Sequence, residues 1–192
     1  SVEKNRPKQS ELYRARRKSP PVAKMKKQIQ RIILRGRNLE DIMPFLQKNG
    51  LALVEENADI VLTHGGDGAL LGAEREFPGI PKFPIRDERT APLCDEHTGY
   101  DELIKLLLGG KLKKTELIKI EGKAKGKALA AVNDVFIHNS DPVSAIRYKV
   151  WIDGRQYGDE IVGDGVGVAT VHGSTAYYRS ITHSIFKVGI GL

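Results

Sequence analysis

The sequence has a single cysteine and no long apolar run. The lone Cys94 leaves no cysteine pair for an internal disulfide or for a structural zinc site. The longest stretch without a charged side chain, Gly165 to Tyr178, is rich in glycine and polar residues and is shorter than the roughly 20 apolar residues that span a bilayer. Neither a transmembrane helix nor a signal peptide is expected, and a cytoplasmic location is the simplest interpretation.

The composition also lacks the marks of a disordered chain. Hydrophobic residues make up 40% and charged residues 29% of the 192 residues, and the mean hydropathy is −0.34. These values favour a soluble globular protein. A chain of this length holds one large domain or two small ones.

Positive charge is concentrated at the amino-terminal end. Residues 1–37 contain 13 Lys or Arg and two Glu, whereas the rest of the chain has 18 basic and 22 acidic residues. Three prolines interrupt this segment, so we predict a flexible basic arm over residues 1–28. Such an arm can hold nucleic acid through phosphate contacts, but solvated basic tails are more common, and nucleic acid is the less favoured partner.

The next segment, residues 29–110, is typical of an α/β domain. Short apolar runs at 31–34, 51–55 and 58–63 predict strands, and a helix is expected from a cap at Asn38 or Asp41 to Gln47. The last of these strands runs into a glycine turn and a helix over 69–76, which is the first half of a parallel unit. A second helix over 100–108 ends at a glycine pair, where we place the domain boundary.

Residues 111–192 follow a period of two instead. Strands are predicted at 115–121, 128–138, 144–152, 156–162 and 184–188, with Asp153-Gly154 at a hairpin tip and Trp151 in the core. The predicted fold class is α/β, with an N-terminal α/β nucleotide-type domain and a following all-β, sandwich-like domain. Too few strands are present to cover a sandwich, so this second domain looks incomplete at its C-terminal end, and its open edge favours a homo-oligomer.

The glycine turn, Gly65-Gly66-Asp67-Gly68, has features suited to phosphate chemistry. Glycines let backbone N–H groups approach phosphate oxygens, and the following helix directs its positive end at the anion. A carboxylate would repel phosphate, so Asp67 is better suited to act as a general base for a hydroxyl or as an indirect magnesium ligand. The alternative is a plain turn in which Asp67 caps the helix.

Two later segments add groups suited to a nucleotide. The adjacent amide and acid of Asn133 and Asp134 can fork onto two ribose hydroxyls, although a strand bulge explains them too. Asp164 begins a strand that opens into a turn of small hydroxyl residues, which either contact a ligand or simply start a helix. The residues of this turn are Ser174, Thr175, Ala176 and Tyr177.

In this order, the three segments resemble the NAD kinase family, whose marks are a GGDG turn, an Asn-acid pair and a D-G…G-S-T-A-Y stretch. The resemblance implies a kinase that phosphorylates the 2′-hydroxyl of the adenosine ribose of NAD to give NADP, with ATP or polyphosphate as donor and Mg²⁺ or another divalent metal. By similarity Asp67 is the catalytic base. The residues implied for nucleotide binding are Gly65, Gly66, Gly68, Asn133, Asp134, Asp164, Ser174, Thr175, Ala176 and Tyr177.

The sequence also departs from the family pattern. Ala69 stands where a Thr is usual, Asp134 replaces the commoner Glu, and the segment 85–94 lacks the usual Gly-x-Asn-x-Gly run. These departures keep two alternatives open, a relative that binds NAD(P) without phosphorylating it and a lipid or sugar kinase that shares only the turn. His64, before the turn, is interpreted as a packed strand-end residue rather than a phosphate ligand.

Overall fold

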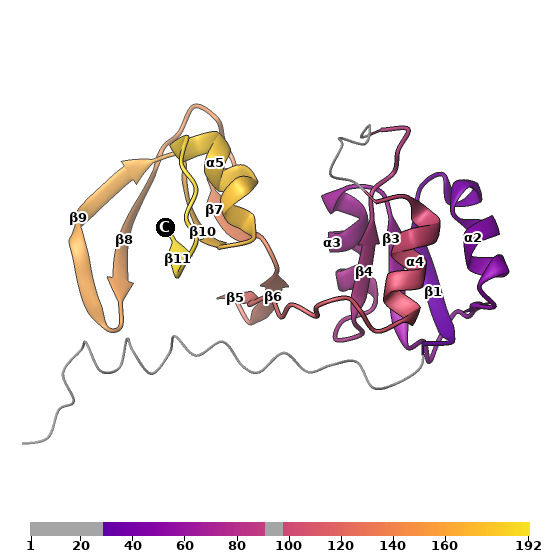
Figure 1. Cartoon of the computed structure of the whole chain (residues 1–192). Coiled ribbons are helices and arrows are strands. Elements are labelled where there is room, and N and C mark those ends of the chain that lie inside the picture. The colour runs from indigo at the N-terminus through magenta and orange to yellow at the C-terminus, as the bar shows by residue number, and fades with distance from the viewer. Residues whose placement is uncertain (1–28, 91–97) are drawn as a thin grey trace, which may run out of the picture. The chain divides into compact units, whose positions relative to one another are not determined.

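The computed structural model describes residues 29–90 and 98–192. The predicted basic arm and Cys94 lie outside these ranges. The chain divides into two compact units, one ending at Thr115 and the other running from Glu116 to Leu192. Figure 1 shows the elements of each unit. Among the residues in these ranges, no helix is long and apolar enough to cross a membrane.

The first unit is built on a parallel sheet with the strand order β2-β1-β3-β4. Apolar runs form its two central strands, of which β3 is buried along its whole length. Successive side chains of β1 point to opposite faces, so Ile32 packs with one core cluster and Ile33 with the other. The strands are β1 (Arg31–Gly36), β2 (Ala52–Leu53), β3 (Ile60–His64) and β4 (Lys82–Ile85).

Helices cover both faces of this sheet (Figure 1). Helices α2 (Met43–Lys48) and α4 (Tyr100–Leu108) pack on the face of Ile32, through Leu46 and Ile104 among others. Helix α3 (Asp67–Glu76) packs on the opposite face through Ala73. A short 3-10 helix, η1 (Leu39–Asp41), precedes α2. This alternation of strands and helices confirms the predicted α/β class.

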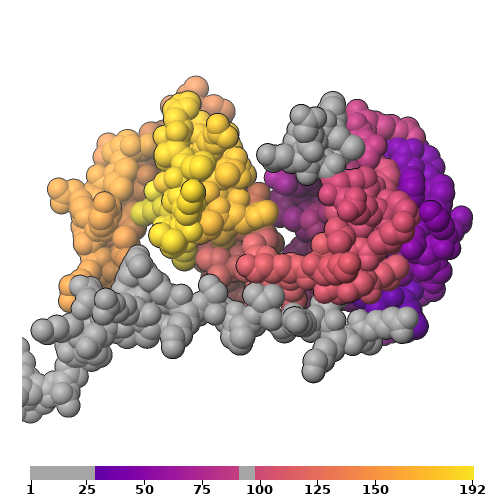
Figure 2. Space-filling model, in the orientation of Figure 1, coloured from indigo at the N-terminus to yellow at the C-terminus, as the bar shows by residue number. Residues whose placement is uncertain are grey.

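The second unit consists of two hairpins and a small antiparallel sheet with the order β11-β10-β7. Its buried residues gather near the end of β10 and the turn that follows. The hairpin β8–β9 extends from the rest of its unit (Figures 1 and 2). The elements are β5 (Ile120–Ala124), β6 (Lys127–Ala131), β7 (Asp134–His138), β8 (Ile146–Ile152), β9 (Arg155–Gly163), β10 (Gly165–Thr170), η2 (Gly173–Thr175), α5 (Tyr177–Thr182) and β11 (Ile190–Gly191).

Local turn chemistry explains one confirmed prediction in this unit. Ile152 pairs with Arg155, so Asp153 and Gly154 form the two-residue turn of the β8–β9 hairpin. Both residues have positive φ, 50° and 76°, as a turn that matches the strand twist requires.

Three predictions about the strands and their core were wrong. The run 115–121 is strand only from Ile120 onward. Residues 184–188 form no strand, since the carbonyl of Phe186 accepts from the Ser174 hydroxyl at 3.1 Å and the pairing with β10 begins only at β11. Trp151 is 57% exposed rather than a core residue, since the second unit packs no layer over it among the residues described.

The helix cap expected at Asn38 or Asp41 is also absent. Helix α2 begins after Ile42, which makes no side-chain cap. Asn38 has left-handed backbone geometry, with φ 49°, and its amide Nδ2 donates to Asp87 Oδ2 at 2.9 Å instead. The side chain thus links two loops rather than starting a helix.

Candidate functional site

The turn Gly65–Gly68 lies at the carboxyl end of β3 and leads directly into α3. Gly65 is buried, and its φ of 147° is a conformation that favours glycine. Gly66 and Gly68 are exposed, and a Cβ on either would meet nothing within 4 Å. The backbone of this turn is therefore open to a ligand.

Asp67 is the first residue of the ten-residue helix α3. The residue before the helix is Gly66, and no side chain caps this end, so the alternative in which Asp67 is a helix cap is not observed. Among the residues the structure describes, the exposed Asp67 carboxylate has no hydrogen-bond or ion-pair partner. The first N–H groups of a helix lack partners within it, so an acceptor-only carboxylate and free donors occur side by side here.

The strand end beneath the turn is closely packed. A Cβ on Gly36, whose φ is 128°, would lie 2.0 Å from the carbonyl oxygen of His64. His64 is fully buried, which confirms its interpretation as a packed residue. The amide of Gly65 donates to the carbonyl of Ile85 at 2.9 Å. The backbone from which the turn starts is therefore held in one position.

In the second unit, Asn133 and Gly173 are in close contact. A Cβ on Gly173 would lie 2.1 Å from the carbonyl oxygen of Asn133, and the amide of Thr170 donates to that same oxygen at 2.8 Å. The side-chain Oδ1 of Asn133 is buried and has no hydrogen-bond partner within residues 29–90 and 98–192. Because an unpaired buried acceptor is costly, this atom is suited to a ligand that brings a hydroxyl or an amide.

Asp134 is the first residue of β7 and pairs with Ala169 of β10. Burial raises the pKa of this carboxyl above its ordinary value. The side chain therefore favours a hydrogen-bond donor that would compensate its charge.

The turn 174–177 presents its groups unevenly. Ser174 is 2% exposed, and its hydroxyl lies 2.7 Å from the carbonyl oxygen of Val171 and 3.1 Å from that of Phe186. Thr175 is exposed, and Ala176 is half-buried with its amide bonded to Gly173. Tyr177 is 57% exposed. The turn thus offers Thr175 and Tyr177 to a ligand, while Ser174 holds the backbone.

Asp164 lies at the other end of the β7–β10 pair. It precedes Gly165, which pairs with His138, whereas Asp134 pairs with Ala169. At the rise of a β-strand, five residues separate the two ends by about 16 Å. Within its unit, the structure brings Asn133 and Asp134 to the 173–177 turn and leaves Asp164 apart, with its carbonyl accepting from the amide of Asn139 at 2.8 Å.

Sequence reasoning missed an aromatic pair beside this turn. The rings of Phe136 and Tyr177 meet edge to face, with centroids 4.6 Å apart. A Cβ on Gly167 would lie 2.0 Å from the Phe136 ring, so only glycine leaves room for it. The glycine alternating with valine in β10 was the available signal.

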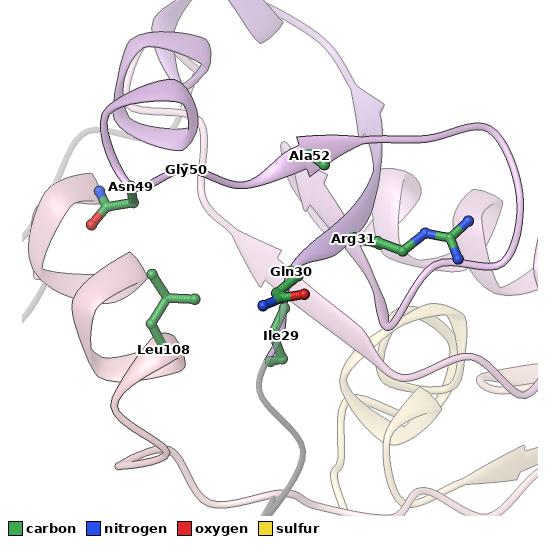
Figure 3. Close-up of a pocket in the computed structure, with 7 residues that line it drawn as sticks. All are labelled: Ile29, Gln30, Arg31, Asn49, Gly50, Ala52 and Leu108. Carbon is green, nitrogen blue, oxygen red and sulfur yellow. The ribbon is translucent and has the colours of Figure 1, made fainter.

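The described residues contain no group of three or more His, Cys, Asp or Glu that could hold a metal ion. A magnesium ion fits here only as an ion carried by substrate phosphates, for which the free carboxylate of Asp67 is a suitable ligand. An open hollow of about 390 Å³ lies at the amino end of β1, at the opposite end from the turn (Figure 3). None of the predicted site residues lines this hollow. Its lining consists of Ile29, Gln30, Arg31, Asn49, Gly50, Ala52 and Leu108.

Comparisons with known proteins were made by sequence and by fold. No family model matches the chain. It is 35% identical over 151 residues to the NAD kinase of Acinetobacter baylyi, covering 73% of this chain and 48% of that protein. It is 33% identical over 147 residues to the NAD kinase of Clostridium botulinum, covering 72% of this chain and 52% of that protein. The chain thus spans about half the length of these relatives.

The fold gives similar matches among solved structures. The yeast NADH kinase complexed with NADH superposes with a TM-score of 0.67 at 18% identity, over 88% of this chain and 67% of that one. The NAD kinase from Archaeoglobus fulgidus in complex with ATP superposes with a TM-score of 0.64 at 18% identity, over 82% and 68%. These likenesses support the two-part α/β and β architecture.

Proposed function

Because its sequence and fold place this chain in the NAD kinase family, we propose that it phosphorylates the 2′-hydroxyl of the adenosine ribose of NAD to give NADP. The observation that carries this proposal is Asp67, an exposed carboxylate without a partner among the described residues, in a turn whose two flanking glycines leave the backbone open. A free carboxylate beside free N–H donors suits a reaction in which a hydroxyl is deprotonated next to a phosphate.

In this proposal Asp67 is the general base. It accepts the proton of the 2′-hydroxyl as the oxygen attacks the terminal phosphorus of the donor. A bond forms between that oxygen and phosphorus, the bond to the bridging oxygen breaks, and ADP leaves when ATP is the donor. The backbone amides of the turn hold donor phosphate oxygens, and the glycines permit their approach.

The acceptor ribose is assigned to Asn133 and Asp134. The unpaired buried Oδ1 of Asn133 would accept a hydrogen bond from a ribose hydroxyl. Asp134, whose pKa burial raises, would accept another. Thr175, Ala176 and Tyr177 would contact the rest of the nucleotide, and Ser174 supports their turn. Asp164, at the other end of the β7–β10 pair, would contact a more distant part of the dinucleotide.

The donor is ATP or polyphosphate, with Mg²⁺ carried on its phosphates. The ion supplies neutralisation of the transferring group, and positioning accounts for most of the rest of phosphoryl transfer. Asp67 is the residue of the turn that would contact the ion through water, which leaves its carboxylate able to act as the base.

The test is NADP formation from NAD, ATP and Mg²⁺ by the intact chain, compared with Asp67→Asn. Loss of a general base lowers the rate about 10²–10⁴-fold. Asp101→Asn is the matched control, since Asp101 is also an acid in the first turn of a helix but pairs with Lys105 and Lys48 on the surface. Full activity of the Asp67→Asn variant would overturn the assignment of the base.

Two further measurements address the alternatives, which the matches to NAD kinases do not favour. Protection against melting by NAD with no NADP formed would point to a binding protein. Phosphorylation of a lipid or sugar without NAD specificity would point to the other kinases with this turn.

We also propose a cytoplasmic homo-oligomer. On the β8–β9 hairpin the apolar side chains of Trp151, Tyr157 and Val162 are exposed at 57%, 61% and 53%. Exposed apolar side chains gathered on one element are candidates for an interaction surface. Light scattering on a sizing column would test this, with Trp151→Lys expected to reduce the mass. A monomeric mass for the original chain would contradict the proposed oligomer.

A further inference from the structure

Four buried or half-buried polar residues link the loops that follow β1, β3 and β4. They are Asn38, His64, Asp87 and Tyr100, called here the polar cluster. His64 and Asp87 are fully buried and Tyr100 is 9% exposed. None of these side chains was assigned a part in the proposed reaction, although His64 immediately precedes the Gly65–Gly68 turn.

The hydrogen bonds of His64 define which ring nitrogen carries the proton. Nδ1 lies 2.7 Å from the carbonyl oxygen of Arg37, which can only accept, so Nδ1 is the donor. Nε2 lies 2.9 Å from the Tyr100 hydroxyl, which therefore donates to it. The Tyr100 oxygen in turn accepts from the amide of Glu88 at 3.2 Å. A single directed chain of hydrogen bonds joins three loops.

A second link runs parallel to the first. Asp87 accepts from Asn38 Nδ2 at 2.9 Å, from the amide of Arg89 at 3.0 Å and from Thr90 Oγ1 at 3.1 Å. This carboxylate connects the loop after β1 to the loop after β4. The two links together hold the three strand ends in one arrangement.

We propose that the His64–Tyr100 hydrogen bond positions the glycine turn for phosphoryl transfer, with His64 and Tyr100 as positioning residues. This inference rests on the proposed kinase function. Asp67 is three residues after His64, and among the described residues the backbone of Gly65 is held by one hydrogen bond, from its amide to the carbonyl of Ile85. A side-chain anchor immediately before the turn therefore determines where the Asp67 carboxylate and the turn amides lie. Small displacements of reacting groups reduce rates strongly.

Tyr100→Phe tests the bond while keeping the ring. The ring still packs edge to face on Phe45, 5.7 Å away, and on His64, 5.3 Å away. We expect kcat to fall about tenfold with KM for NAD unchanged, and amide hydrogen exchange to accelerate at Gly65, whose amide is bonded to Ile85. Phe45→Leu is the control, because it weakens packing on the same ring and leaves the hydrogen bonds intact.

The histidine side gives a test by rescue. His64→Ala removes both bonds, whereas the Gln of His64→Gln places an amide near the position of Nε2 and can bond the Tyr100 hydroxyl. We expect His64→Gln to recover part of the kcat lost in His64→Ala. In the double variant with Tyr100→Phe, that recovery is expected to vanish.

The outcomes separate this inference from the proposed function. If the intact chain makes no NADP, the function fails, and hydrogen exchange at the Gly65 amide alone decides the inference. If Tyr100→Phe melts at a lower temperature, as Phe45→Leu does, but keeps its kcat and its exchange rates at the turn, the bond is merely structural and the positioning role is overturned.

Discussion

The carbonyl oxygen of Asn133 lies 2.1 Å from the position that a Cβ would occupy on Gly173. Any larger residue at position 173 would therefore push the 173–177 turn away from the Asn133 backbone. The same oxygen accepts from the Thr170 amide, and the Thr170 hydroxyl accepts from the amide of Gly173 at 3.1 Å. The arrangement of the proposed ribose site depends on this contact.

Gly173→Ala is expected to abolish NAD binding while the first unit stays folded, because the added methyl group collides with backbone that has no room to move. Calorimetric titration with NAD measures the loss. Gly163→Ala is the control, since a Cβ there meets nothing within 4 Å. Unchanged affinity in Gly173→Ala would show that the contact does not shape the site.

Asp134→Asn is expected to stabilise the protein at neutral pH and to weaken NAD binding. Burial raises the pKa of Asp134 in the folded state, so the favourable contribution of its protonated form is present at low pH and is lost as the pH rises through that pKa. The amide avoids this loss. Urea unfolding of both proteins measures the gain, which should shrink as the pH approaches the ordinary value of 3.8. An equal gain at every pH would exclude the carboxyl as its cause.

Asp87→Asn is expected to reduce the loss of stability that the protein undergoes as the pH falls. Burial by itself raises the pKa of Asp87, but hydrogen bonds from the Arg89 amide, Thr90 and Asn38 lower it below its ordinary value of 3.8. The stabilisation is therefore present above 3.8 and is lost as the pH falls through the folded-state pKa. Unfolding midpoints between about pH 6 and about pH 3 should fall more steeply for the original chain than for the variant. Parallel curves would contradict this.

Glu76→Gln is expected to lower the free energy of unfolding by about 0.5–1 kcal/mol at low salt. Arg35 donates to Glu76 from Nε at 3.2 Å and from Nη2 at 3.0 Å, which attaches the end of α3 to β1. Its bond to Glu55, at 3.3 Å, ends on a side chain that is 87% exposed, so Glu55→Gln should cost less. The difference between the two losses should decrease in about 1 M salt, where ions screen the attraction between exposed charges. Equal losses in the two variants would show that the Glu76 pair has no special weight.

Local sequence predicted the parts of the fold that depend on local chemistry. The apolar run of β3 followed by glycines indicated the strand, the turn and α3, and Asp153-Gly154 indicated the hairpin. The matches to NAD kinases confirm the resemblance drawn from the three motifs. The roles of the individual site residues and the boundary after Gly110 stay predictions.

Other features depend on contacts between distant residues and gave no local signal. His64 and Tyr100 are 36 positions apart, and only the packing of α4 on the sheet brings them together. Ser174 looked like a ligand contact in the sequence, yet its hydroxyl faces the carbonyls of Val171 and Phe186. Trp151 looked like a core residue because its strand alternates, but alternation does not say whether a second layer covers the strand.

The two-residue hairpin turns have a kinetic consequence. Ala124 pairs with Lys127, and Ile152 with Arg155, so β5–β6 and β8–β9 each close a minimal loop. Hairpins of this kind form within about 1–10 µs. In the first unit, Ile32 pairs with Ile60 only after an intervening helix and strand have been traversed, and parallel pairing of this kind has a high contact order. During synthesis the part of the chain made first therefore acquires its sheet slowly, while the part made later forms its first native pairs almost at once.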